Sequence, residues 1–277
     1  MFKTIQSQVW AFDAEWVPDP NAGRALYRIP SYISDEEVIR EMWRRGGATD
    51  ENPQPFLKVA LCRIVSVAAV LRRVSSDGEL KIELLSLPRS SEDTEADIIS
   101  RFLSAVGKYK PQLVGFNSVQ SDLRIFIQRA VIHGISLPEF CARPDKPWEG
   151  VDYFAKESEF HIDLFQLLGG WGKGAPSLHE IATLSGIPGK LGLDGFMVPS
   201  LWLEGKIDII RQYNECDALT TYLLWLRVAL VSGLIDLEQY NKEEELVKDV
   251  IHSLSQPHLT DYLREWKRLT TNSGTVN

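Results

Sequence analysis

The chain has 277 residues and a formal net charge of −8, with 44% hydrophobic and 25% charged residues. This length is enough to bury a sizeable core, and the composition is typical of a folded protein rather than a disordered one. The acidic balance argues against a broad basic surface for nucleic acid. It does not exclude a local site, because acids gathered around divalent metal ions would reverse the sign of the charge there.

The cysteine residues and the N-terminal sequence indicate the cellular compartment of the protein. Cys62, Cys141 and Cys216 are far apart and show no CxxC spacing. Three separated cysteines favour reduced thiols in the core, as in a cytoplasmic protein. No basic region followed by an apolar run marks a signal peptide, and the longest apolar stretches are too short to span a bilayer. We therefore expect a cytoplasmic protein without a membrane partner.

The first predicted element is a strand over residues 9–16. Period-two alternation places Asp13 and Glu15 on the face of Val9 and Ala11, and the aromatic side chains on the other. Two carboxylates that leave an apolar strand on the same face are costly unless a cation or hydrogen-bond donors compensate them. The alternative is that the strand ends at Asp13 and that both acids are solvated.

Residues 18–55 form a polar insertion, which is long for a connection between two strands and typical of a lid or a mobile segment. A capping box that begins at Ser34, followed by Val38 and Met42, predicts a short helix within it. We expect the insertion to lie over the acidic site. Its basic side chains either follow a nucleic-acid strand or form solvated ion pairs with neighbouring glutamates; they are Arg40, Arg44 and Arg45.

The remaining elements are strand pairs followed by alternating helices and strands. Strands are expected over residues 57–74, 80–87, 113–116 and 161–165, with a hairpin turn at Asp77 and Gly78. Helices are expected over residues 91–109, 123–133, 177–186, 209–225, 235–252 and 257–269. This order predicts an α/β fold with a mixed sheet flanked by helices. The glycine-rich run 169–174 lacks the spacing of a P-loop.

Two further sites carry acids. Asp122 begins the helix after strand 113–116, where an acid is ordinarily a cap, and Asn117 at the strand end is ordinarily a turn residue. Tyr213 and Asp217 lie four residues apart on one helix face. That pair suits metal chemistry, because the carboxylate holds a cation and the phenol positions a water. The alternative is an exposed Asp and a half-buried Tyr on an amphipathic helix.

The acids follow the order Asp-x-Glu, Asn-x4-Asp and Tyr-x3-Asp, and these positions are Asp13, Glu15, Asn117, Asp122, Tyr213 and Asp217. In this order the sequence resembles the DEDD 3′-5′ exonucleases of the ribonuclease-H-like superfamily, in their Tyr-containing subclass. It is similar to predicted exonucleases related to the proofreading domain of B-family DNA polymerases. The resemblance extends over residues 9–230 and includes the motifs at 115–117, 161–164 and 186–190.

The resemblance implies hydrolysis with two divalent cations, Mg²⁺ or Mn²⁺, held by carboxylate oxygens. Asp13 would bridge both ions, Glu15 and Asp217 would complete one site, and Asp122 would support the second. Tyr213 would orient the attacking water.

Substrate contacts are predicted at Asn117, Trp16 and Lys190. The expected activity is release of 5′-mononucleotides from single-stranded 3′ ends, with DNA favoured over RNA and with a replication or repair protein as a partner. The alternative is a non-catalytic nucleic-acid-binding or interaction module of the same fold. Relatives often carry an aromatic residue and a proline around the second-motif acid, where this chain has Ser121 and Arg124.

The domain organisation follows from the same reading. Residues 1–232 are predicted to form the exonuclease domain, with the insertion at 18–55. Residues 233–277 are predicted to be a helical extension packed on it.

Overall fold

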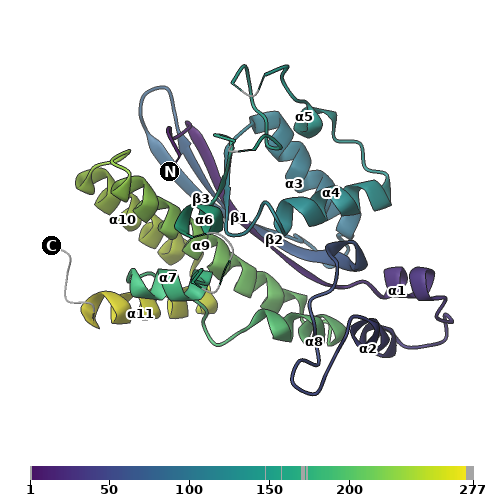
Figure 1. Ribbon diagram of the computed structural model, residues 1–277. Coiled ribbons are helices and arrows are strands. Elements are labelled where there is room, and N and C mark those ends of the chain that lie inside the picture. The colour runs from purple at the N-terminus through teal and green to yellow at the C-terminus, as the bar shows by residue number, and fades with distance from the viewer. Residues whose placement is uncertain (1, 147, 157, 170–171, 173, 273–277) are drawn as a thin grey trace.

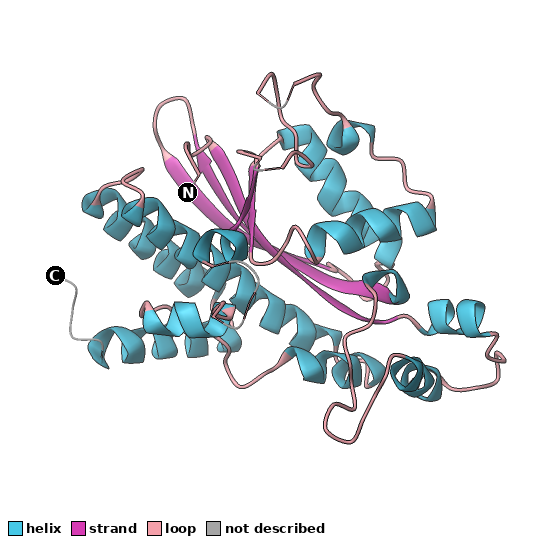
Figure 2. Cartoon of the chain, in the orientation of Figure 1, coloured by secondary structure: helices cyan, strands magenta, loops and turns pink. Residues whose placement is uncertain are grey.

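The computed structural model describes residues 2–146, 148–156, 158–169, 172 and 174–272. Its centre is a mixed five-stranded sheet in the order β3-β2-β1-β4-β5 (Figures 1 and 2). The β1–β2 and β2–β3 pairs are antiparallel, whereas β1–β4 and β4–β5 are parallel. The strands are β1 (Gln8–Pro18), β2 (Cys62–Val74), β3 (Leu80–Leu87), β4 (Gln112–Gly115) and β5 (His161–Asp163).

Helices cover both faces of the sheet (Figure 1). On one face lie α9 (Ile207–Val231), α10 (Leu237–Leu254) and α11 (Pro257–Asn272); on the other lie α3 (Glu95–Tyr109) and α4 (Asp122–His133). Alternate side chains of β1 enter the two apolar clusters, with Val9 and Ala11 in the first and Trp10, Phe12 and Ala14 in the second. The predicted alternation and the predicted α/β fold are therefore confirmed.

Helix α9 crosses one face of the sheet and is longer than predicted at both ends. Residues 218–226 are all buried, and Tyr222 and Trp225 have no exposed surface. This burial arises because α10 and α11 pack in the same apolar cluster, through side chains such as Tyr240 and Tyr262. A helix that is apolar all round is expected where it is enclosed in this way.

An ion pair joins α10 to the sheet. Arg72 of β2 donates two hydrogen bonds to the carboxylate of Glu243, at 2.8 Å each, and Glu243 has no exposed surface. The hydroxyl of Tyr222 donates a third, at 2.6 Å. Residues of the predicted C-terminal extension thus share a core and an ion pair with the sheet. The division of the chain at residue 232 stays a prediction.

The insertion folds as two helices, α1 (Pro20–Tyr27) and α2 (Asp35–Arg45), and the predicted capping box at Ser34 is present. Val38 and Met42 of α2 belong to the apolar cluster that contains Phe12 and Ala14, whose side chains leave β1 on the face opposite Asp13 and Glu15. The insertion is therefore anchored on the far face of the sheet, and its apolar contacts do not show the expected position over the acids.

The remaining elements are short: α5 (Pro138–Cys141), α6 (Leu164–Leu168), α7 (Leu178–Leu184), α8 (Val198–Leu203) and the 3₁₀ turns η1 (Val59–Leu61) and η2 (Gly195–Met197). The strand predicted over 161–165 ends at Asp163, because that side chain accepts the N–H of Phe165 at 3.0 Å and caps α6. Cys62 and Cys216 are buried, but Cys141 is exposed at the end of α5, so its assignment to the core is wrong.

Positions 170–171 and 173 of the glycine-rich run lie outside the described residues. Within the part of the chain that is described, no helix combines the length and apolar character needed to cross a bilayer.

Candidate active site

Strand β1 presents Asp13 and Glu15 on the same face, as the alternation predicts. Both residues are half-buried. Glu15 pairs in register with Ser66 of β2, and the ladder shifts between Glu15 and Trp16. The strand therefore carries the acids into the interior and then bends directly after the second one.

Helix α9 brings a third carboxylate to the first two. Oxygen atoms of Asp13, Glu15 and Asp217 all lie within 4.8 Å of one another. The spacing of Tyr213 and Asp217 on one turn places the phenol beside this cluster, and the Tyr213 hydroxyl is hydrogen-bonded to Asp217. The Tyr213 ring packs in an apolar cluster with Val198 of α8. Packing thus fixes the position of the phenol.

Asp122 approaches the same strand from the opposite edge. Its Oδ1 accepts the backbone N–H of Ala14 at 3.1 Å, and its Oδ2 accepts the hydroxyl of Ser121 at 2.8 Å. The β1–β4 ladder ends at the pair of Ala11 and Val114. Asp122 therefore supplies an acceptor to β1 beyond the point where β4 stops, in addition to standing at the start of α4.

A further acid, Asp163 at the end of β5, shapes the loop that carries Asp122. Its carboxylate accepts the N–H groups of Asn117 at 2.8 Å and Val119 at 3.1 Å. Asn117 has a positive φ of 61°, which suits an asparagine in a tight turn. His161 is hydrogen-bonded to Ser118 at 2.9 Å. The motif at 161–164 thus fixes the conformation of the loop that leads to Asp122.

The four acids perturb one another. Burial raises the pKa of Asp13 and of Glu15 well above their usual values, and the neighbouring carboxylates raise them further. Burial also raises the pKa of Asp122 and of Asp217 to about 6. The positive charge of Lys190 acts in the opposite direction on Glu15 and Asp217. A cluster of carboxylates that disfavour ionisation together is the donor set expected for a hard divalent cation.

The phenol of Tyr213 behaves differently. Burial, and then the charge of Asp217, raises the pKa of Tyr213 far above its usual range. Burial thus favours the protonated phenol, which can act as a hydrogen-bond donor.

The three predicted substrate contacts lie in different settings. Lys190 is close enough to act on the cluster, and its Nζ lies 2.9 Å from Asp194. Asn117 is in the loop held by Asp163, and its Oδ1 is buried without a hydrogen-bond partner among the described residues. Trp16 packs with the apolar cluster on the far face of the sheet.

Sequence reasoning missed two residues of the site. Asn214, which is fully buried on α9, donates its side-chain N–H to Asp13 Oδ2 at 2.6 Å. Its Oδ1 lies 3.0 Å from the hydroxyl of Ser66, which donates to it. The only feature of the sequence that pointed to Asn214 was its position inside the Tyr-x3-Asp motif. No feature of the sequence pointed to Ser66, because its role depends on the register between β1 and β2.

These elements define an α/β nuclease-like architecture, with three carboxylates gathered from β1 and α9 and a fourth from the start of α4. Residues 54–266 match the family of predicted 3′-5′ exonucleases related to the exonuclease domain of PolB, and the chain belongs to this family. The matched span begins after β1, so it includes Asp122, Tyr213 and Asp217 but leaves Asp13 and Glu15 outside.

A structural comparison supports the same fold. The chain is similar to the family B DNA polymerase from the hyperthermophilic archaeon Pyrobaculum calidifontis, with a TM-score of 0.50 and 18% sequence identity. The match covers 82% of this chain and 25% of the polymerase, so the chain spans about a quarter of that protein. The fold is that of a ribonuclease-H-like exonuclease domain. No curated protein matches the chain.

Proposed function

We propose that the chain is a 3′-5′ exonuclease of the Tyr-containing DEDD subclass, which releases 5′-mononucleotides from single-stranded ends. The observation that carries the proposal is the cluster of Asp13, Glu15 and Asp217, whose carboxylate oxygens lie within 4.8 Å. Membership of a family of predicted 3′-5′ exonucleases supports the polarity. DNA is the preferred strand in this proposal, because the family is related to a DNA polymerase domain.

The cluster fits divalent cations by the chemistry of its donors, which are all carboxylate oxygens. Asp13, Glu15 and Asp217, with support from Asp122, would hold two ions, Mg²⁺ or Mn²⁺. When bound, such ions supply a nucleophilic water at neutral pH and neutralise charge on the attacking and leaving oxygens.

The side chains around the cluster orient the reacting groups. The hydroxyl of Tyr213, which is hydrogen-bonded to Asp217 in the structure, would turn to orient the attacking water. Asn214 fixes the rotamer of Asp13 through the 2.6 Å hydrogen bond. Lys190 would place its positive charge next to the phosphate at the edge of the cluster. Its Nζ would leave Asp194 to do so. Asn117 and Trp16 remain predicted substrate contacts.

The alternative of a binding module without activity receives less support. Four carboxylates that face a phosphate would weaken binding unless metal ions compensate them, so a pure binding protein gains nothing from keeping them together. A replication or repair protein as a partner and a cytoplasmic location stay predictions.

The test uses the purified chain with Mg²⁺ or Mn²⁺ and 5′-labelled single-stranded DNA and RNA. We expect a ladder of products shortened from the 3′ end, faster on DNA, and no ladder in EDTA or with the Asp13→Ala and Asp217→Ala variants. Binding of the oligonucleotides without any shortening would favour the binding module instead.

A further inference from the structure

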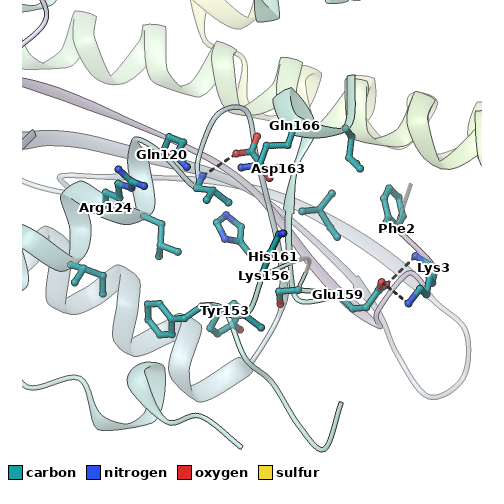
Figure 3. A pocket seen from close by; sticks show the side chains of 18 of the residues that line it. Phe2, Lys3, Gln120, Arg124, Tyr153, Lys156, Glu159, His161, Asp163 and Gln166 are labelled. Atoms are coloured by element: carbon teal, nitrogen blue, oxygen red, sulfur yellow. Dashed lines mark hydrogen bonds and ion pairs between the residues drawn. The ribbon is translucent and has the colours of Figure 1, made fainter. Parts of the chain in front are cut away.

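A cavity of about 870 Å³ lies beside strand β5 (Figure 3). Its walls come from residues 2–3, from the loop before α4 and α4 itself, from residues 153–156 and 158–159, and from β5 and α6. Asp13, Glu15 and Asp217 do not line it. The volume falls in the range of pockets that bind small molecules. The cavity is therefore a candidate binding site separate from the acid cluster.

Two cationic side chains line this cavity without a partner. Arg124 and Lys156 are both exposed, and neither forms an ion pair or a hydrogen bond with another described residue. Figure 3 shows Arg124 beside Gln120 at one end, whereas Lys3 and Glu159 pair with each other at the opposite end. In a chain of net charge −8, two cations that have no partner among the described residues and that line one cavity favour an anionic ligand.

Aromatic rings form another part of the wall. Tyr153 and Phe154 line the cavity, and Phe140 holds both of them from behind. The ring of Phe140 stacks on Tyr153 with 5.4 Å between centroids and 22° between planes, and it makes an edge contact with Phe154 at 5.4 Å. Tyr153 is only 4% exposed, so the half-buried ring of Phe154 is the accessible part of this wall. A ring held rigidly in this way suits a planar ligand, because stacking on it costs little conformational entropy.

The wall also contains an unsatisfied acceptor. Oε1 of Gln128 is buried and has no hydrogen-bond partner among the described residues, and Gln128 lines the cavity. A buried acceptor without a donor costs free energy. Rotation of the Gln128 side chain toward the cavity would let a ligand N–H group reach this oxygen and recover that cost. The exocyclic amine or ring N–H of a nucleobase is such a donor.

We propose that this cavity binds one nucleotide unit, with its phosphate at Arg124 and Lys156 and its base against Phe154, beside Gln128. An anionic group, a planar ring and a hydrogen-bond donor are the three features that the walls select. The site needs no metal ion, so the proposal does not depend on cleavage at the acid cluster. The nucleotide is either a free mononucleotide or one unit of a strand.

Binding of dAMP in excess EDTA tests the proposal by isothermal titration calorimetry. EDTA removes metal-dependent binding at the acid cluster, so the remaining signal reports the cavity. We expect saturable binding to the wild type, a loss of affinity of at least about tenfold in Arg124→Glu/Lys156→Glu, and no change in Asp217→Asn. The matched control, Arg89→Glu/Lys110→Glu, makes the same charge change at exposed positions outside the cavity and should bind as the wild type does.

A second variant separates the base from the phosphate. Gln128→Leu should weaken dAMP binding and leave competition by inorganic phosphate unchanged, whereas the charge reversal should weaken both. Competition by oligo(dT) identifies the source: stronger competition per nucleotide than by free dTMP indicates a strand, and equal or weaker competition indicates a mononucleotide. Absence of dAMP binding in EDTA, or equal losses in the charge-reversal variant and its control, would overturn the proposal.

Discussion

The side-chain amide of Asn214 donates a hydrogen bond to Oδ2 of Asp13 over 2.6 Å, although the two residues are 201 positions apart in the chain. The carbonyl oxygen of the same amide accepts the hydroxyl of Ser66 at 3.0 Å. Asn214 thereby ties α9 to β1 and β2 at the acid cluster. The direction in which Asp13 presents its carboxylate depends on this residue.

Replacing Asn214 by Ala tests that dependence. The variant frees the rotamer of Asp13 and leaves a polar gap, and we expect exonuclease turnover to fall by about 10- to 100-fold, as for other residues that orient metal ligands. The matched control is Thr221→Ala, at another fully buried polar position of α9 whose hydroxyl has no partner among the described residues. Equal activity in the two variants would show that Asn214 does not orient Asp13.

The alternation of β1 predicts that Asp13 and Glu15 share a face, and the four-residue spacing on α9 predicts the same for Tyr213 and Asp217. Local periodicity fixes the face from which a side chain leaves its element, whereas the meeting of the two pairs was implied by the resemblance to the DEDD exonucleases. Asn214 and Ser66 could not be predicted in the same way. Their contact requires the position of α9 on the sheet and the register of β2, and both follow from packing between distant segments.

For the insertion, the sequence predicted the helix but not the surface on which it packs. Its helix α2 was predicted from the capping box, but a local signal does not say where a helix docks. Val38 and Met42 were known to be apolar, yet the cluster they enter is built from α3, α4 and the far face of β1. The cavity beside β5 could not be predicted either, since its walls come from three stretches that are far apart in the chain: the N-terminus, the region of α4, and the region around β5 and α6.

Asp217→Asn should stabilise the metal-free protein at neutral pH. The folded-state pKa of Asp217 is raised to about 6, chiefly by burial, so the stability linked to its protonated form is lost as pH rises through that value. The amide avoids this loss. In EDTA we expect a melting temperature a few degrees above the wild type at pH 7.5, with the difference closing by pH 4.5. A lower melting temperature at pH 7.5 would contradict the conclusion that burial of the ionised carboxylate is unfavourable.

Tyr213→Phe should reduce turnover while metal binding persists. The ring keeps its packing with Val198, and only the hydroxyl group is lost. We expect turnover to fall by about ten- to a thousandfold, which corresponds to one lost positioning hydrogen bond in the transition state. Metal affinity, measured by calorimetry with Mn²⁺, should change little. Equal losses in metal affinity and turnover would indicate a structural role for Tyr213.

Arg72→Met should strongly destabilise the fold, because it leaves the carboxylate of Glu243 buried without its main partner. Breaking a buried pair in this way costs about 3–5 kcal/mol, measured by chemical denaturation. The double variant Arg72→Met/Glu243→Met removes both charges and should recover most of the loss. If the double variant is no more stable than the single one, the cost comes from packing and not from the unpaired charge.

The arginines of α2 should contribute little to binding of nucleic acid. Arg40 pairs with Glu36 at 2.5 Å, and Arg44 and Arg45 both pair with Glu41, at 2.6 and 2.7 Å. These two hydrogen-bonding partners lower the pKa of Glu41 to about 2. The structure thus contains the solvated ion pairs expected at helical spacing, and helix α2 is anchored on the sheet face opposite the acids.

Replacing all three arginines by Gln distinguishes a role in binding nucleic acid from a role in surface ion pairs alone. Because their charges are already paired at the surface, we expect unchanged affinity for long single strands and an unchanged slope of affinity against salt concentration. Cleavage of a dinucleotide should also be unchanged. Weaker binding of long strands with a shallower salt dependence would show instead that the ion pairs open and that α2 follows the strand to the acid cluster.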